Sequence, residues 1–94
     1  MNSVADFVNP EQVETMATPA NLRLGREIDR KGGVTFSIFG PLEVVARVTN
    51  GVARSVTLRS DGRALTWRCT CTGNRRLFCK HCVAVATAAW NRAP

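Results

Sequence analysis

The four cysteines of this chain lie within fourteen residues, and the only histidine lies among them. They are Cys69, Cys71, Cys79 and Cys82, with His81 between the last two. Four cysteines can form two disulfides in a secreted chain, but the N-terminus has neither the basic nor the apolar region of an export signal. We therefore expect a cytoplasmic protein whose thiols stay reduced. Clustered thiols and an imidazole then favour a tetrahedral metal site, most of all for Zn²⁺.

The spacing within the cluster favours four of these five side chains as ligands. Residues 69 and 71 point the same way on a strand, so Cys69 and Cys71 present two thiolates together. If a helix begins near Cys79, His81 and Cys82 point about 100° apart and do not easily reach one metal. Cys82 instead begins an apolar helical stripe and is interpreted as a small buried hydrophobe. A role for Cys82 as fourth ligand or as a redox-active thiol is the alternative.

Two sequence segments resemble a SWIM zinc finger, whose motif is CxCx(n)CxH. The first is WRCTC at 67–71, and the second is FCKHCVAVA at 78–86, which is similar to the bacterial small-protein branch of that family. The finger is expected at 67–91, and the stretch from Gly33 also resembles the strands that precede it in bacterial members. By position, the resemblance implies zinc ligands at Cys69, Cys71, Cys79 and His81. It also implies a function in DNA or protein contacts.

A chain of 94 residues predicts one domain, 1–94, with a small core that needs a fastener. Three thiolates and one imidazole complete a tetrahedron, which is typical of one structural zinc ion rather than a catalytic one. No pair of carboxylates has a spacing suited to acid–base catalysis. We therefore predict a module that is not an enzyme and has no small-molecule substrate.

Alternating apolar residues in the segment 33–68 predict an antiparallel meander of three or four strands. Gly40-Pro41, Asn50-Gly51 and Asp61-Gly62 are turn signals between them. In the first strand Val34, Phe36 and Ile38 share the apolar face. Phe39 is out of phase with that face and is interpreted as a half-covered hydrophobe, with an exposed platform for base stacking as the alternative. Across the last turn, Leu65 and Trp67 lead into Cys69 on one face.

Helices are expected on either side of these strands. Asn9-Pro10-Glu11 is a helix start and predicts a short helix over 10–17. Residues 18–32 are expected to be irregular, as a loop or with a short strand. The segment 80–91 lacks Gly and Pro, and predicts a C-terminal helix packed on the sheet with Trp90 as its anchor. The predicted fold class is α+β, with the metal site joining the last strand to this helix.

Charge is unevenly distributed along the chain. Residues 1–45 carry four basic and six acidic side chains, whereas residues 46–94 carry nine basic and one acidic. A basic half is typical of a polyanion partner, although it also serves solubility alone. The leading hypothesis is a module that binds DNA or RNA, and the alternative is a protein–protein interaction module; no apolar run is long enough for a membrane span. The candidate nucleic-acid contacts are Arg63, Arg68, Arg75, Arg76 and Lys80.

Overall fold

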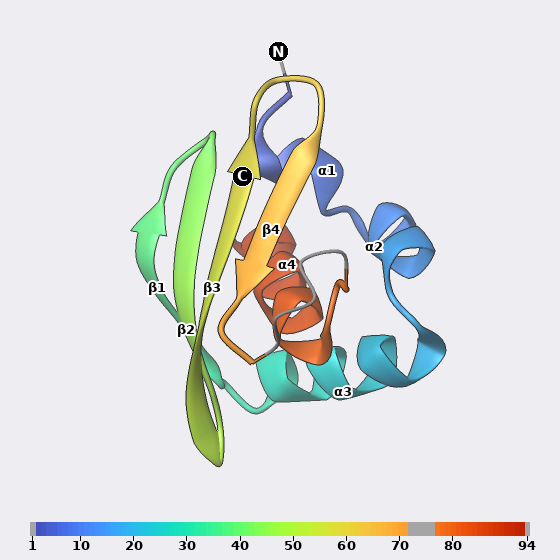
Figure 1. Cartoon of the computed structure of the whole chain (residues 1–94), viewed down its shortest axis with the longest axis vertical. Coiled ribbons are helices and arrows are strands. Elements are labelled where there is room, and N and C mark those ends of the chain that lie inside the picture. The colour runs from blue at the N-terminus through green and yellow to red at the C-terminus, as the bar shows by residue number, and fades with distance from the viewer. Residues whose placement is uncertain (1, 72–76, 94) are drawn as a thin grey trace.

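The chain forms a sheet that is covered on one face by helices (Figure 1). A computed structural model describes residues 2–71 and 77–93, and its α+β class matches the sequence prediction. Within those residues the elements are α1 (Val4–Phe7), α2 (Pro10–Met16), α3 (Pro19–Arg30), β1 (Val34–Phe39), β2 (Glu43–Asn50), β3 (Val52–Ser60), β4 (Leu65–Cys69) and α4 (Lys80–Arg92).

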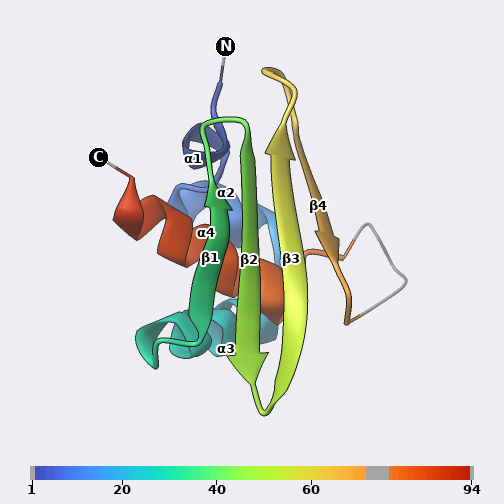
Figure 2. The ribbon, with the colours of Figure 1, turned by 90° about the vertical axis from the view of Figure 1, so that its left-hand side faces the viewer.

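The strands form the predicted antiparallel meander, in the order β1-β2-β3-β4 (Figure 2). β2 and β3 meet at Gly51, whose φ of 83° is a conformation that glycine adopts without strain. Between β3 and β4, the Asp61 carboxylate accepts hydrogen bonds of 2.8 Å from the backbone N–H groups of Arg63 and Ala64. The turn signals therefore specify two of the three connections by local chemistry.

The first strand departs from simple alternation. The pairing of β1 with β2 shifts between Phe36 and Ile38, which leaves a bulge at Ser37. The bulge reverses the phase of the last two residues, so Phe39 is paired with the buried Val44 and lies on the helix side. Its ring centroid lies 4.9 Å from that of Phe36, and its side chain is 37% exposed, which agrees with a half-covered hydrophobe. Ile38 instead lies on the opposite face and is 46% exposed, so its predicted place on the apolar face is wrong.

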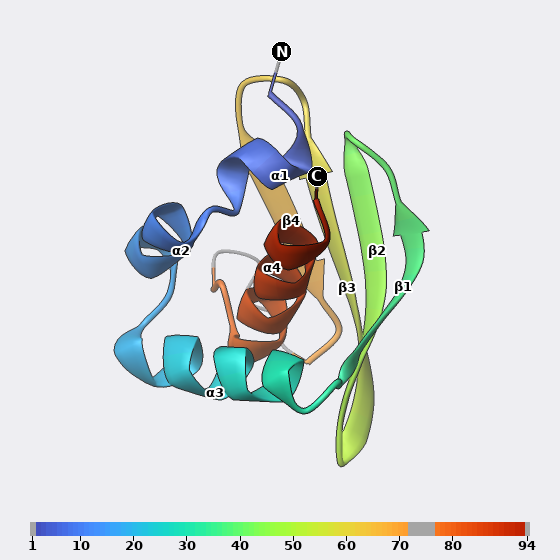
Figure 3. The same cartoon turned by 180° about the vertical axis from the view of Figure 1, so that it is seen from behind.

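Helix α4 lies at the centre of the molecule, between the sheet and the three N-terminal helices (Figure 3). Its residues 81–86 are all buried, because the sheet covers one side of the helix and α1–α3 cover the other. The sheet contributes Val44, Val48, Val56 and Leu58 to the same core. The predicted anchor Trp90 lies near the end of α4 and is 43% exposed, so the helix is anchored by its middle and not by its tryptophan.

The segment predicted to be irregular is largely helical. α3 begins at Pro19, where the Thr18 hydroxyl accepts a hydrogen bond of 3.2 Å from the Asn21 N–H and caps the helix. The prediction for residues 18–32 is therefore wrong, whereas the helix predicted over 10–17 is confirmed as α2. The earlier turn α1 was not predicted. It is capped reciprocally by Ser3 and Asp6.

Helices α3 and α4 cross at Gly25. A Cβ atom built on Gly25 would lie 2.5 Å from Val83 Cβ and 2.6 Å from the Lys80 carbonyl oxygen. We expect Gly25→Ala to reduce the free energy of unfolding by about 1–3 kcal/mol, because overpacking outweighs the higher helix propensity of alanine. Urea unfolding measures this change, with Leu24→Ala on the exposed side of α3 as the control. A stabilised Gly25→Ala protein would show that the two helices are not in close contact.

Candidate metal centre

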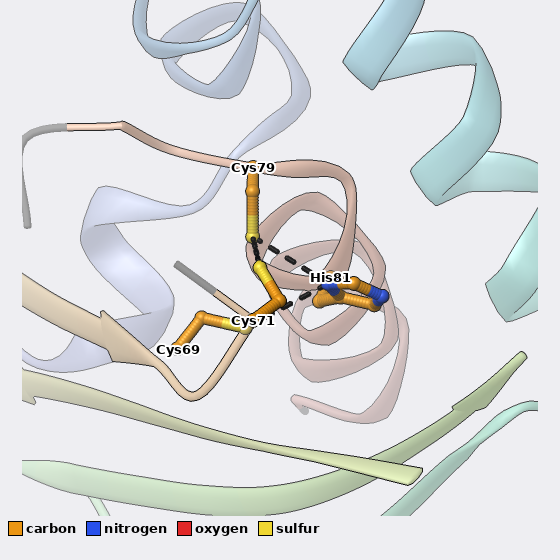
Figure 4. Close-up of side chains that lie close together, drawn as sticks. All are labelled: Cys69, Cys71, Cys79 and His81. Atoms are coloured by element: carbon orange, nitrogen blue, oxygen red, sulfur yellow. Dashed lines mark hydrogen bonds between the residues drawn. The ribbon is translucent and has the colours of Figure 1, made fainter. Parts of the chain in front are cut away.

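The four predicted ligands come from two places that the fold brings together (Figure 4). Cys69 is the last residue of β4, and Cys71 follows two residues later. Cys79 is the N-cap of α4, and His81 is the second residue of that helix. The sheet edge and the start of the central helix therefore present all four side chains to one point.

The distances between the donor atoms fit a tetrahedral ion. Cys69 Sγ lies 3.7 Å from His81 Nδ1, and Cys79 Sγ lies 3.7 Å from the same nitrogen. Cys71 Sγ lies 3.6 Å from Cys79 Sγ, and all four donor atoms lie within 4.8 Å of one another. Zinc bonds of about 2.0–2.3 Å place neighbouring donors of a tetrahedron roughly 3.3–3.8 Å apart. The residues present therefore fit Zn²⁺ in ligand type, number and spacing.

The backbone fixes the two halves of the site independently. On the strand side, the Thr70 N–H donates to the Ser55 carbonyl at 3.1 Å, and the Ser55 N–H donates to the Thr70 hydroxyl at 3.0 Å. These bonds extend the pairing beyond β4 and hold Cys69 and Cys71 on the helix side. On the other half, the Val83 N–H donates to the Cys79 carbonyl at 3.0 Å as α4 begins. The positive end of the helix dipole then favours a thiolate at Cys79.

The protein groups alone do not favour three thiolates. Hydrogen bonds with the Cys69 and Cys82 side chains lower the pKa of the Cys79 thiol. Burial, together with hydrogen bonds to Cys69 and Cys79, raises the pKa of the Cys71 thiol to about 12. A buried group of sulfurs that holds one negative charge resists a second one. A divalent cation supplies the charge that makes Cys71 ionise as well.

We expect zinc affinity to fall as the pH falls. Because Cys71 holds its proton at neutral pH without metal, zinc binding must release that proton, and each proton released changes the affinity about tenfold per pH unit. Competition with a chromophoric chelator at about pH 6.5 and about pH 7.5 measures the change. An affinity that is equal at both values, after correction for the chelator, would show that Cys71 is already ionised or does not bind.

Cys82 lies beside the four ligands but outside their group. Its side chain is fully buried in the hydrophobic core, and its Sγ lies 3.8 Å from Cys79 Sγ. The donor group found among the described residues contains Cys69, Cys71, Cys79 and His81 without it. Neighbouring sulfurs and burial raise the pKa of the Cys82 thiol, in line with its interpretation as a small apolar core residue.

Two aromatic side chains support the ligands from the core. Trp67 lies two residues before Cys69, and Phe78 lies directly before Cys79. Their rings meet edge to face, with centroids 5.1 Å apart, and Phe78 is fully buried. Trp67 is partly buried against the core, in keeping with its predicted place on the same face as Cys69. One aromatic contact therefore links the two halves of the site.

The predicted nucleic-acid contacts that the structure describes do not form one patch. Arg63 is exposed in the β3–β4 turn, and Lys80 is half-buried at the start of α4. Arg68 points away from the helices, because Trp67 and Cys69 on either side of it point toward them. The structure thus places Arg68 and Lys80 in different layers. Arg75 and Arg76 lie outside the described residues.

Sequence reasoning missed two basic residues on the sheet. Arg47 of β2 and Arg59 of β3 lie on the same face of the sheet as Arg68, as the strand register shows. The alternation of β2 and β3 carries this information, since both arginines are out of phase with the apolar residues.

Among the described residues, no helix is both long enough and apolar enough to cross a membrane.

Comparison with known proteins identifies the segment that holds the site. The family model of the SWIM zinc finger matches residues 55–89, which include most of β3, all of β4, the four donors and most of α4. The match begins at Ser55, well after the resemblance expected from Gly33. Searches among curated proteins and among solved structures found no match. The family match and the converging Cys₃His donors together establish that this chain carries a SWIM zinc finger at residues 55–89.

Proposed function

We propose that this protein is a nucleic-acid-binding module whose fold is held by one structural zinc ion. Four donors, three from cysteine and one from histidine, fill a tetrahedron and leave no position for a water or substrate. This donor set supports a structural ion, and a protein without catalytic activity. A zinc ion held by these donors would cross-link the end of β4 to the start of α4.

The charge distribution is the observation that carries the nucleic-acid assignment. Residues 46–94 contain nine basic side chains and one acidic side chain. The acidic residues are concentrated elsewhere, since five of the seven lie in α1–α3. Two of these acidic side chains form ion pairs with basic residues of the same region: Glu14 binds Arg26, and Glu27 binds Lys31. The basic excess of the sheet and the finger therefore remains available to a polyanion.

Titration with nucleic acid tests the proposal. The zinc-loaded protein, its metal content verified by elemental analysis, is titrated with labelled single-stranded and double-stranded oligonucleotides at about 50 mM and about 200 mM salt. Phosphate contacts predict that log affinity falls with log salt, with a slope of about 0.7 per phosphate neutralised on a single strand and about 0.9 on a duplex. A protein with no affinity for either polymer at the lower salt would refute the proposal and leave the protein-interaction module.

A further inference from the structure

The outer face of the sheet is not covered by any described helix. α1–α4 all lie on the other side of the sheet (Figures 1 and 2). The register places thirteen side chains on the outer face, and most of them are hydroxyl or basic residues. They are Thr35, Ile38, Glu43, Val45, Arg47, Thr49, Ala53, Ser55, Thr57, Arg59, Thr66, Arg68 and Thr70. We call this set the open face.

The open face carries a net positive charge. Arg59 forms an ion pair of 2.6 Å with Glu43, the only carboxylate of the set, and the two residues are direct cross-strand partners. Arg47 and Arg68 are exposed, and neither forms an ion pair with another described residue. The face therefore offers two unpaired guanidinium groups, which bind phosphate oxygens through paired N–H donors.

The open face is also hollowed. A groove of about 800 Å³ crosses all four strands, from Ile38 on β1 through Val45 and Thr57 to Arg68 on β4. A smaller hollow of about 350 Å³ continues the same face, with Arg47, Ser55 and Thr70 in its lining. Apolar and hydroxyl groups thus form the floor of the groove, and arginines lie along its course.

The strand register sets the distances between the three arginines of the open face. Arg68 is opposite Thr57, and Arg59 lies two residues along β3, so their Cα atoms are about 8 Å apart. Arg47 lies two strands away and one alternate position along, about 12 Å from Arg68. Arg59 and Arg47 are displaced from Arg68 in opposite directions along the strands, so the three arginines form a triangle, and a flexible phosphate chain can reach the two that are unpaired. A rigid duplex meets the flat side of a sheet poorly, since its major groove accepts a protruding helix or a two-stranded ribbon.

From this arrangement we infer that the open face is the docking surface for single-stranded nucleic acid, with phosphates held by Arg47 and Arg68 and bases lying over the groove floor. This inference rests on the proposed function, and it adds which surface of the protein binds and which form of nucleic acid is bound. It differs from the set of contacts predicted from the sequence, because Lys80 and Arg63 lie outside the open face. Contacts from arginine to phosphate carry no sequence information, so binding is expected to be independent of sequence.

Matched charge variants test this assignment on the zinc-loaded full chain. The first variant combines Arg47→Gln with Arg68→Gln on the open face. The control combines Arg23→Gln with Arg30→Gln on α3, which removes the same charge from the opposite layer. All four side chains are exposed, so zinc content and far-UV circular dichroism should match those of the unchanged protein. Affinity for a single-stranded oligonucleotide is then measured over a range of salt concentrations.

The open-face variant is expected to lose at least about tenfold in affinity at about 50 mM salt, and its salt slope should fall by about 1.4, or 0.7 for each lost phosphate contact. The control should change by about threefold or less. Equal losses in the two variants would overturn the inference but not the proposed nucleic-acid binding. The same holds if the unchanged protein binds duplex more tightly than single strands. If the unchanged protein binds neither polymer, the proposed function itself fails.

Discussion

Removal of zinc is expected to unfold the protein, at least over the region from Cys69 to Trp90. Structural zinc sites bind with apparent free energies of about 10–16 kcal/mol, and native proteins of this kind are stable by about 5–15 kcal/mol. The ion joins β4 to α4, and α4 is the element on which both the sheet and α1–α3 pack. Loss of the cross-link is therefore expected to destabilise both the sheet and the N-terminal helices.

Chelation followed by circular dichroism measures this effect. Far-UV signal should fall, and near-UV signal from Trp67 should disappear, once elemental analysis shows that the metal is gone. Cys82→Ala provides the matched control, because Cys82 is equally buried but lies outside the donor group. That variant should keep one zinc ion, whereas Cys79→Ala should lose it. Spectra that are unchanged after complete removal of zinc would show that the fold is stable without it.

Phe78→Ala is expected to cost about 3–5 kcal/mol of unfolding free energy in the zinc-loaded protein. Phe78 is the largest fully buried side chain in the described core, and its ring packs edge to face on Trp67. Its replacement leaves a cavity directly behind Cys79, so the variant should also bind zinc more weakly. Both effects follow from one missing ring.

Urea unfolding with saturating zinc measures the stability change, and chelator competition measures the affinity. The neighbouring residue gives the control: Leu77 is 38% exposed, and Leu77→Ala should cost less than about 1 kcal/mol. A Phe78→Ala protein as stable as the Leu77→Ala protein would show that the core does not support the metal centre.

The features predicted correctly from the sequence are those set by local chemistry. Alternation and turn residues specify the meander, because each turn signal acts within a few residues and the β2–β3 hairpin closes at Gly51. The ligand positions likewise follow from short spacing, since Cys69 and Cys71 share one side of an extended chain. The converging geometry of the four donors then results from the way β4 leads into α4.

The features that were missed depend on contacts between distant residues. α3 contains Gly25 and many charges, so its sequence looks irregular, but its inner side is defined by close contact with Val83. The bulge at Ser37 changes which of Ile38 and Phe39 lies on the helix side of the sheet, and no alternation pattern encodes it. Trp90 is exposed because α4 extends past the elements that cover its middle.

The central place of α4 has a consequence for biosynthesis. The ribosome makes this helix after every other described element, yet the sheet and the N-terminal helices both need its apolar surface as their partner. While α4 is still in the exit tunnel, the emerged chain lacks this partner for Val13, Ile28 and Val56. Its folding must therefore wait until α4 leaves the tunnel and packs between the sheet and the N-terminal helices.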